Sequence, residues 1–243
     1  MVIYGINPTL EALRAGRVTE IQVSARRDRR IAGVLRLATE RGAAVREVPP
    51  EVLDRAAHGR VHQGVVAHVA AAQSHTIDEL LRVAGRPPLV VVLDGIQDPQ
   101  NFGAILRVAD AAGADGVVHQ TRRAAPPGPA AAKASAGALA HVRLVPVVNI
   151  RRALDELKAA GLWTVGLAPE GAQSLYATDL AGPTAVVLGA EQTGLRRLVR
   201  EGCDWLVAIP MRGRVASLNV AVAAGVVLFE AVRQRAVAAG AAR

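Results

Sequence analysis

The stretch 209–230 constrains the fold more than any other part of this chain, because a polar, glycine-bearing loop runs directly into a long apolar segment. That segment is uncharged up to its last residue and is too long for a strand. Ser217 or Asn219 can satisfy the free N–H groups at a helix start, so we expect a helix from there to about Gln234. Its residues are apolar on nearly every side, which predicts burial on more than one face. Two arginines flank the glycine of the preceding loop (212–214), so a ligand, an interface and the core can meet at this element.

The composition indicates a folded protein with one large or two medium domains. Of its 243 residues, 51% are apolar, which is ample for a core. No apolar run reaches the roughly twenty residues that span a bilayer, and the N-terminus lacks the pattern of a signal peptide. We therefore expect a cytoplasmic protein with no membrane partner. The single cysteine, Cys203, has no Cys or His at metal-ligand spacing, so we expect a buried thiol and no zinc site.

The charge suits a partner rich in phosphate, but it does not require one. The formal net charge is +8, and every basic residue except Lys133 and Lys158 is an arginine. Arginine presents a planar fork to phosphate oxygens, and the summed field attracts anions. A GC-rich genome, which encodes arginine where others use lysine, would give the same composition. Aromatic residues are scarce, which argues against recognition by rows of stacked bases.

Helix and strand patterns alternate over residues 1–73, and this alternation predicts a small three-layer α/β domain. We expect helices over 7–16, 29–41 and 50–57 and strands over 20–25, 44–48 and 64–70. Asn7 is the expected cap of the first helix and Pro8 lies in its first turn. Four polar residues at 58–63, including Arg60 and His62, lie in the loop before the last strand, where they can contact RNA or simply face solvent.

Residues 74–88 read as a linker with one short helix over 77–83, and residues 89–243 as a second α/β domain. In this second part we expect strands over 89–93, 116–119, 143–147, 163–167, 185–188 and 206–209, and helices over 101–112, 150–160 and 195–201 before the final one. The segment 121–137, rich in glycine, alanine and proline, is expected to be a mobile loop whose second half can form a helix. Buried strands joined by short connections predict a mainly parallel sheet with helices on both faces and ligands at its carboxyl end.

A first polar cluster covers residues 94–107, between an expected strand and the middle of a helix. Gly103 lies one helical turn before Arg107, so another group can approach the helix closely there. A glycine inside a helix costs about 1 kcal/mol relative to alanine, which we expect a function to explain better than packing. Asn101 can cap the helix or hold a ligand. The G-x-G-x-x-G pattern of dinucleotide sites is absent, so the usual Rossmann mode of binding NAD or S-adenosylmethionine is not expected.

Two further clusters complete an ordered set of motifs. Residues 187–194 read Val-Leu-Gly-Ala-Glu-Gln-Thr-Gly, and residues 209–219 contain Ile-Pro-Met and Ser-Leu-Asn. Together with Asn-x-Gly-x-x-x-Arg at 101–107, they resemble the motifs of the SpoU/TrmH family of RNA ribose 2′-O-methyltransferases. The likeness extends to Tyr-Gly-Ile-Asn-Pro at 4–8 and His-Gln-Gly-Val-Val at 62–66, which resemble the family's N-terminal RNA-binding domain.

The resemblance implies an L30e-like N-terminal α/β domain and a C-terminal SPOUT domain, whose mainly parallel sheet carries a deep trefoil knot. Knots are exceptions to the rule that chains do not thread loops, and the patterns alone would suggest an ordinary open sheet. The family's cofactor is S-adenosylmethionine, and the chain would form a homodimer through its knot region. The implied cofactor-binding residues are Leu188, Gly189, Ile209, Met211 and Leu218. No metal is expected.

The implied reaction is methyl transfer to a ribose 2′-hydroxyl, and the resemblance assigns Arg107 to activate that hydroxyl. A guanidinium is a poor base, so we expect Arg107 to stabilise the forming oxyanion and to anchor the neighbouring phosphate. Asn101, Glu191, Ser217 and Asn219 would orient Arg107, the substrate or the cofactor. The RNA would contact His62, Arg60 and three basic residues of the segment 121–137, namely Arg122, Arg123 and Lys133.

The resemblance favours a guanosine of 23S ribosomal RNA as the target, because the N-terminal domain is present. Two other functions remain open. One is a ribose 2′-O-methyltransferase that acts on transfer RNA. The other is a catalytically silent RNA-binding module, which the basic charge permits but which does not require Asn101, Arg107, Glu191 and Ser217 in register.

Overall fold

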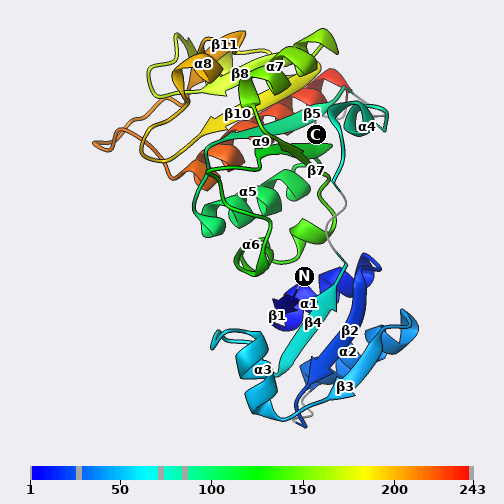
Figure 1. Ribbon diagram of the computed structural model, residues 1–243. Coiled ribbons are helices and arrows are strands. Elements are labelled where there is room, and N and C mark those ends of the chain that lie inside the picture. Colours follow the sequence, from blue (N-terminus) through cyan, green and yellow to red (C-terminus); the bar gives the residue numbers. More distant parts are fainter. Residues whose placement is uncertain (1, 26–28, 71–73, 84–86, 241–243) are drawn as a thin grey trace.

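The computed structural model describes residues 2–25, 29–70, 74–83 and 87–240, and the chain forms two sheets (Figure 1). We call residues 2–70 the N-terminal unit and residues 74–240 the C-terminal unit. Residue 73, where the first predicted domain ends, and residues 84–86 of the predicted linker lie outside the described residues. Within the described ranges, no helix is both long and apolar enough to span a bilayer.

The N-terminal unit is a four-stranded sheet with helices on both faces. Its elements are β1 (Val2–Tyr4), α1 (Ile6–Arg14), β2 (Val18–Val23), α2 (Arg29–Glu40), β3 (Ala44–Glu47), α3 (Pro50–Ala56) and β4 (Val65–Val69). The strand order is β1-β4-β2-β3, in which only β2 and β3 are parallel. Residues of α1 and α2 pack on one face, and Leu53 of α3 packs against Tyr4 and Val66 on the other. The predicted three layers are confirmed. Strand β1, only three residues long, was not predicted.

The C-terminal unit is built on a seven-stranded sheet. Its helices are α4 (Ile77–Leu81), α5 (Pro99–Ala111), α6 (Pro129–Ala134), α7 (Ile150–Ala159), α8 (Arg197–Arg200) and α9 (Val220–Ala238), with 3₁₀ turns η1 (Ala138–Ala140) and η2 (Leu175–Ala177). Its strands are β5 (Leu89–Asp94), β6 (Gly116–Gln120), β7 (Leu144–Val147), β8 (Trp163–Leu167), β9 (Gln173–Ser174), β10 (Thr184–Gly189) and β11 (Trp205–Ala208). The order is β7-β6-β5-β10-β8-β11-β9, and neighbouring strands are parallel. The predicted parallel sheet is therefore confirmed.

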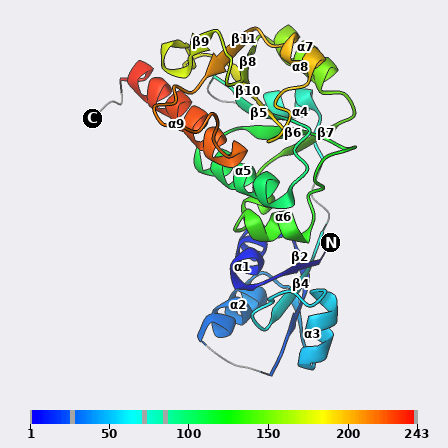
Figure 2. The same ribbon diagram turned by 90° about the vertical axis from the view of Figure 1, so that its left-hand side faces the viewer.

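Side chains of the central strands alternate between two cores. Leu89, Val91 and Leu93 of β5 face α5 and α9, whereas Val90 and Val92 face α4 and α7. Because both faces are covered, as Figures 1 and 2 show, the strand is apolar throughout. Short connections from strands to helices place the polar motifs at the carboxyl end of this sheet.

Helix α6 lies between α5 and the N-terminal unit (Figures 1 and 2), and it concerns two expectations. The helix expected as an option for the second half of the segment 121–137 is present, and Ala131 within it is fully buried. A Cβ on Gly103 would lie 2.5 Å from the carbonyl oxygen of Ala131. The glycine in α5 is thus explained by close helix packing rather than by function.

The cap of the first helix also differs from the prediction. Helix α1 begins at Ile6, one residue before the predicted cap Asn7, and Gly5 at its N-cap position has no side chain to offer. The side-chain oxygen of Gln63 accepts a hydrogen bond from the Ile6 N–H at 3.0 Å instead. A cap supplied from 57 residues away leaves no local signal in the sequence.

Candidate functional site

Three side chains from distant parts of the sequence form a chain of hydrogen bonds at the carboxyl end of the large sheet. The side-chain amide of Asn219 donates to the Asn101 oxygen at 2.9 Å, and the Asn101 amide donates to the Glu191 carboxylate. The Asn101 side chain thus accepts from Asn219 and donates to Glu191. The Asn219 side chain donates to Asn101 and accepts from the Ala221 N–H, so the orientation of both side-chain amides is fixed. The structure brings together three of the five predicted catalytic residues.

Local capping explains why these residues stand where they do. The Asn219 oxygen accepts from the N–H groups of Ala221 and Val222 at 2.9 and 3.4 Å, so Asn219, not Ser217, caps α9. Helix α5 is capped by Asp98, whose carboxylate accepts from the N–H groups of Gln100 and Asn101. Asn101 is therefore free of capping, and its side chain faces the other two residues.

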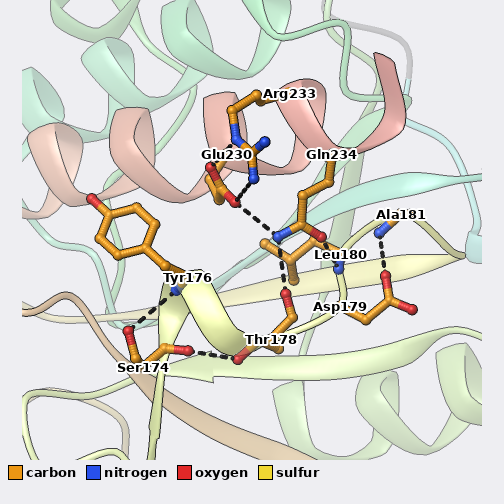
Figure 3. Close-up of polar contacts among 9 residues, drawn as sticks. All are labelled: Ser174, Tyr176, Thr178, Asp179, Leu180, Ala181, Glu230, Arg233 and Gln234. Atoms are coloured by element: carbon orange, nitrogen blue, oxygen red, sulfur yellow. Dashed lines mark hydrogen bonds and ion pairs between the residues drawn. The ribbon is translucent and has the colours of Figure 1, made fainter. Parts of the chain in front are cut away.

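The far half of α9 is anchored to the segment 174–181, as Figure 3 shows. Gln234 accepts from the Leu180 N–H at 2.7 Å and donates to the Thr178 carbonyl at 3.0 Å. Glu230 is 8% exposed, and its hydrogen bonds from Arg233 keep its pKa below the usual value against the opposing effect of burial. These contacts hold α9 in place, so that Asn219 at its other end stays beside Asn101.

A cleft of about 420 Å³ opens beside the hydrogen-bond chain. All five residues predicted to bind the cofactor line it: Leu188, Gly189, Ile209, Met211 and Leu218. Glu191 and Ser217 lie on its wall as well. A Cβ on Gly189 would lie 2.2 Å from the carbonyl carbon of Gly194, so only glycine allows the chain to turn back over the strand end.

Arg107 and Ser217 stand apart from this hydrogen-bond chain. Arg107 is exposed and lies about 9 Å along α5 from Asn101. Neither side chain makes a hydrogen bond or ion pair within the part of the chain that the structure describes. Both side chains are thus available to a ligand.

The predicted RNA-binding residues fall into two groups. Arg122 and Arg123 are exposed and follow the carboxyl end of β6, whereas Lys133 lies on α6 with its ammonium 5.9 Å from the centre of the Tyr4 ring. Arg60 and His62 line an open groove of about 1030 Å³ in the N-terminal unit.

The groove residues are held by hydrogen bonds. His62 Nδ1 accepts from the Gly64 N–H at 3.1 Å, so Nε2 is the nitrogen that faces Asp54, also at 3.1 Å. Arg60 donates to the Tyr4 hydroxyl at 3.0 Å. Tyr4 therefore contacts one predicted RNA-binding residue in each unit.

Comparisons with known proteins agree with this geometry. The model of the SpoU rRNA methylase family matches residues 88–229, and a model described as RNA 2′-O ribose methyltransferase substrate binding matches residues 2–75. The chain belongs to the SpoU rRNA methylase family. Within the described residues, no group of three or more His, Cys, Asp or Glu side chains could hold a metal ion.

Its relatives in the family cover nearly the whole chain. A 23S rRNA (guanosine-2′-O-)-methyltransferase, RlmB, of Pseudomonas syringae is 46% identical over 96% of this chain and 95% of its own length. The SpoU methyltransferase AviRb of Streptomyces viridochromogenes, solved with the cofactor AdoMet, is 29% identical with a TM-score of 0.82 over 97% of this chain and 90% of its own. The TrmH/SpoU tRNA modifying enzyme of A. aeolicus, 29% identical with a TM-score of 0.57, covers 65% of this chain and 80% of its own.

Sequence reasoning missed one residue of this SpoU site. Asp94, at the end of β5, is fully buried and binds both the backbone and the side chain of Arg196. A signal was present, because an acidic residue directly after five apolar strand residues is unusual unless it is paired. Its partner, 102 residues further along, could not be read from the pattern.

Proposed function

We propose that this chain transfers a methyl group from S-adenosylmethionine to the ribose 2′-hydroxyl of a guanosine in 23S ribosomal RNA. The observation that carries the proposal is the Glu191–Asn101–Asn219 chain at the edge of the cleft. The relative from Pseudomonas syringae, which bears the name of this activity, matches both units of this chain.

The cleft suits a nucleoside with an amino-acid tail. Its volume of about 420 Å³ lies in the range of small-molecule sites, and its walls combine apolar side chains with the polar turn around Glu191. Leu188, Ile209 and Leu218 would contact an adenine ring, and backbone groups of the tight turn after Gly189, which also lines the cleft, would bind the edge of that ring. When bound, S-adenosylmethionine supplies a methyl group activated by its sulfonium.

Arg107 would stabilise the ribose oxygen that attacks this methyl group. A ribose 2′-hydroxyl is a weak nucleophile, so developing negative charge on its oxygen must be stabilised. Arg107 is exposed and unpaired within the described residues, so its guanidinium can bind the oxygen and an adjacent phosphate together. The oxygen–methyl bond would form as the sulfur–methyl bond breaks, and the hydroxyl proton would pass to a phosphate oxygen or to water.

The N-terminal unit would bind the RNA through the groove that holds Arg60 and His62. Arg122, Arg123 and Lys133 would extend this surface towards the cleft. In this proposal, residues 1–73 are the RNA-binding domain, 74–88 the linker, and 89–243 the methyltransferase domain. An enzyme that modifies ribosomal RNA acts where ribosomes are assembled, so we place it in the cytoplasm.

A homodimer through the knot region is the second part of the proposal. Three large apolar side chains on α9 are at least half exposed: Val222 at 54%, Phe229 at 50% and Val237 at 52%. They recur at helical spacing and form one stripe, which suits an interface better than solvent. The trefoil knot is inferred from family membership, and the insertion of β10 between β5 and β8 is compatible with it.

The dimer is tested by Phe229→Asp, which would bury a charge in that interface. We expect the wild type to elute as a dimer in light-scattering chromatography and the variant to dissociate at micromolar concentration. The exposed Val148, 67% accessible and remote from α9, provides the control Val148→Asp, which should remain dimeric. A monomeric wild type would contradict the proposal.

The reaction itself is tested by transfer of labelled methyl to unmodified 23S ribosomal RNA, with transfer RNA beside it. We expect one ribose-methylated guanosine in the ribosomal RNA. Methylation of transfer RNA alone would move the target and keep the chemistry. No methylation of either RNA would contradict the proposal, and absence of cofactor binding as well would favour the silent RNA-binding module.

A further inference from the structure

An ion pair between the buried carboxylate of Asp94 and the half-exposed side chain of Arg196 joins the two segments that carry Asn101 and Glu191. Asp94 is 0% exposed at the end of β5. One of its oxygens accepts from the Arg196 backbone N–H at 2.8 Å, and the other accepts from Arg196 Nε at 2.7 Å and contacts a terminal guanidinium nitrogen. A buried carboxylate is strongly unfavourable without such partners. Separating the two segments would leave Asp94 unpaired and would therefore cost considerable free energy.

The segment 189–196 begins and ends at this same aspartate. Gly189 is the parallel partner of Asp94 in the pairing of β10 with β5. Between the two ends, the Gly194 N–H donates to the Ala190 carbonyl at 2.8 Å. Glu191 therefore stands on a short closed turn whose entry and exit are both held at Asp94.

We propose that the Asp94–Arg196 pair is a positioning element that holds Glu191 where it can accept from Asn101. This inference rests on the proposed function. The residues of the turn from Glu191 to Thr193 are exposed and lack a core contact of their own, so the closure at Asp94 fixes the turn. Asp94 also precedes the loop that leads to Asn101, so one buried residue sets both partners of the hydrogen bond.

The direct test is Asp94→Asn, which keeps the size of the side chain. A carboxamide has one oxygen, so either the Arg196 N–H or its guanidinium would face an NH₂ group. We expect kcat for methyl transfer to fall at least tenfold. The dissociation constant of S-adenosylmethionine should change less than threefold, because the strand pairing at Gly189 remains. Arg196→Ala should reproduce this split, and Arg196→Lys should restore most of kcat. This arginine pair decides the test if Asp94→Asn does not fold.

A double-variant comparison with Glu191→Ala distinguishes a positioning role of Asp94 from a general contribution to stability. In a Glu191→Ala background, Asp94→Asn should lower kcat less than twofold, because the residue it positions is already absent. The matched control is Asp204→Asn. Asp204 also accepts a hydrogen bond from a backbone N–H of this sheet, that of Thr164 at 2.8 Å, but it does so at the amino end of the strands, away from the cleft. The control should lower the melting temperature and leave kcat unchanged.

Hydrogen exchange of the peptide 190–196 gives a readout that does not need the reaction. Asp94→Asn should speed exchange there by tenfold or more, and Asp204→Asn should not. An unchanged kcat in Asp94→Asn, or the same loss of kcat with and without Glu191, would overturn the proposal. A wild type that methylates no RNA would refute the proposed function instead, and the exchange result would then decide whether Asp94 holds the turn.

Discussion

The two ends of the seven-stranded sheet use the same chemical group for different tasks. At the carboxyl end, Asp94 binds Arg196 and closes a turn; at the amino end, Asp204 binds the Thr164 N–H and hydroxyl at 2.8 and 2.7 Å and Lys158 at 2.8 Å. Beside Asp204, the rings of Trp163 and Trp205 stack with centroids 4.8 Å apart.

The difference lies in what each carboxylate holds. Asp204 ties the starts of two neighbouring strands together, and it lines neither the cleft beside Asn101 nor the groove of the N-terminal unit. Asp94 ties a strand end to a turn that carries exposed polar side chains beside a cleft of about 420 Å³. One end of the sheet thus contributes stability, and the other arranges groups for a ligand.

Arg107→Ala should produce the largest effect, and it tests the carboxyl end. Loss of a group that stabilises an oxyanion costs about 10²–10³ in rate, so kcat should fall by that factor. Arg107→Lys keeps the charge without the planar fork and should recover only part of the loss. Single-turnover methyl transfer measures both variants. Arg107→Lys at the parental rate would show that fork geometry is irrelevant.

Asn101→Ala should have the next largest effect, because Asn101 joins Glu191 to Asn219. A small displacement of positioned groups can lower rates about 100-fold, and we expect a fall in kcat of that order. In the double variant, Asn101→Ala and Glu191→Ala together should lower kcat by less than the product of their separate effects, as measured by the same assay. Additive losses would mean that the hydrogen-bond chain does not act as a unit.

Asp204→Asn tests the amino end and should affect stability alone. The Thr164 N–H would lose a charged acceptor, which costs about 1–3 kcal/mol and lowers the melting temperature by a few degrees. Calorimetry measures the loss, and kcat serves as the control. A comparable loss of kcat would break the contrast between the two ends.

The same residue predicts a pH dependence. Burial alone would raise the pKa of Asp204, but the hydrogen bonds from Lys158 and Thr164 bring it below the ordinary value of 3.8. Its contribution to stability should therefore be complete above pH 3.8 and be lost as the pH falls through the lower folded value. Asp204→Asn should remove this part of the acid dependence in thermal melts.

The thiol of Cys203 probes the amino end of the sheet, and its effect on stability should be the smallest of those considered. Burial raises the pKa of its thiol from 9.0 to about 12, so little thiolate exists at pH 8. A thiol reagent should react slowly with the native protein and fast after unfolding. The raised pKa also means that stability falls as the pH rises from about 9 towards 12. Fast native labelling would show that this end opens.

Local patterns predicted much of the fold, and the ordered motifs named most of the residues that the structure places around the cleft. Buried strands such as β5 were visible because both of their faces are apolar, and Asn219 was one of two expected caps for α9. Contacts made only on folding were not visible. Gly103 was misread because α6 packs against it from another part of the chain. The partner of Asp94 and the cap from Gln63 were hidden for the same reason.

The most direct test of the contrast between the two ends is hydrogen exchange with and without S-adenosylmethionine. We predict slower exchange on binding in peptides that cover 188–194 and 209–222, and no change in peptides that cover 163–165 and 203–206. Protection at the amino end, or none at the carboxyl end at saturating S-adenosylmethionine, would contradict the account.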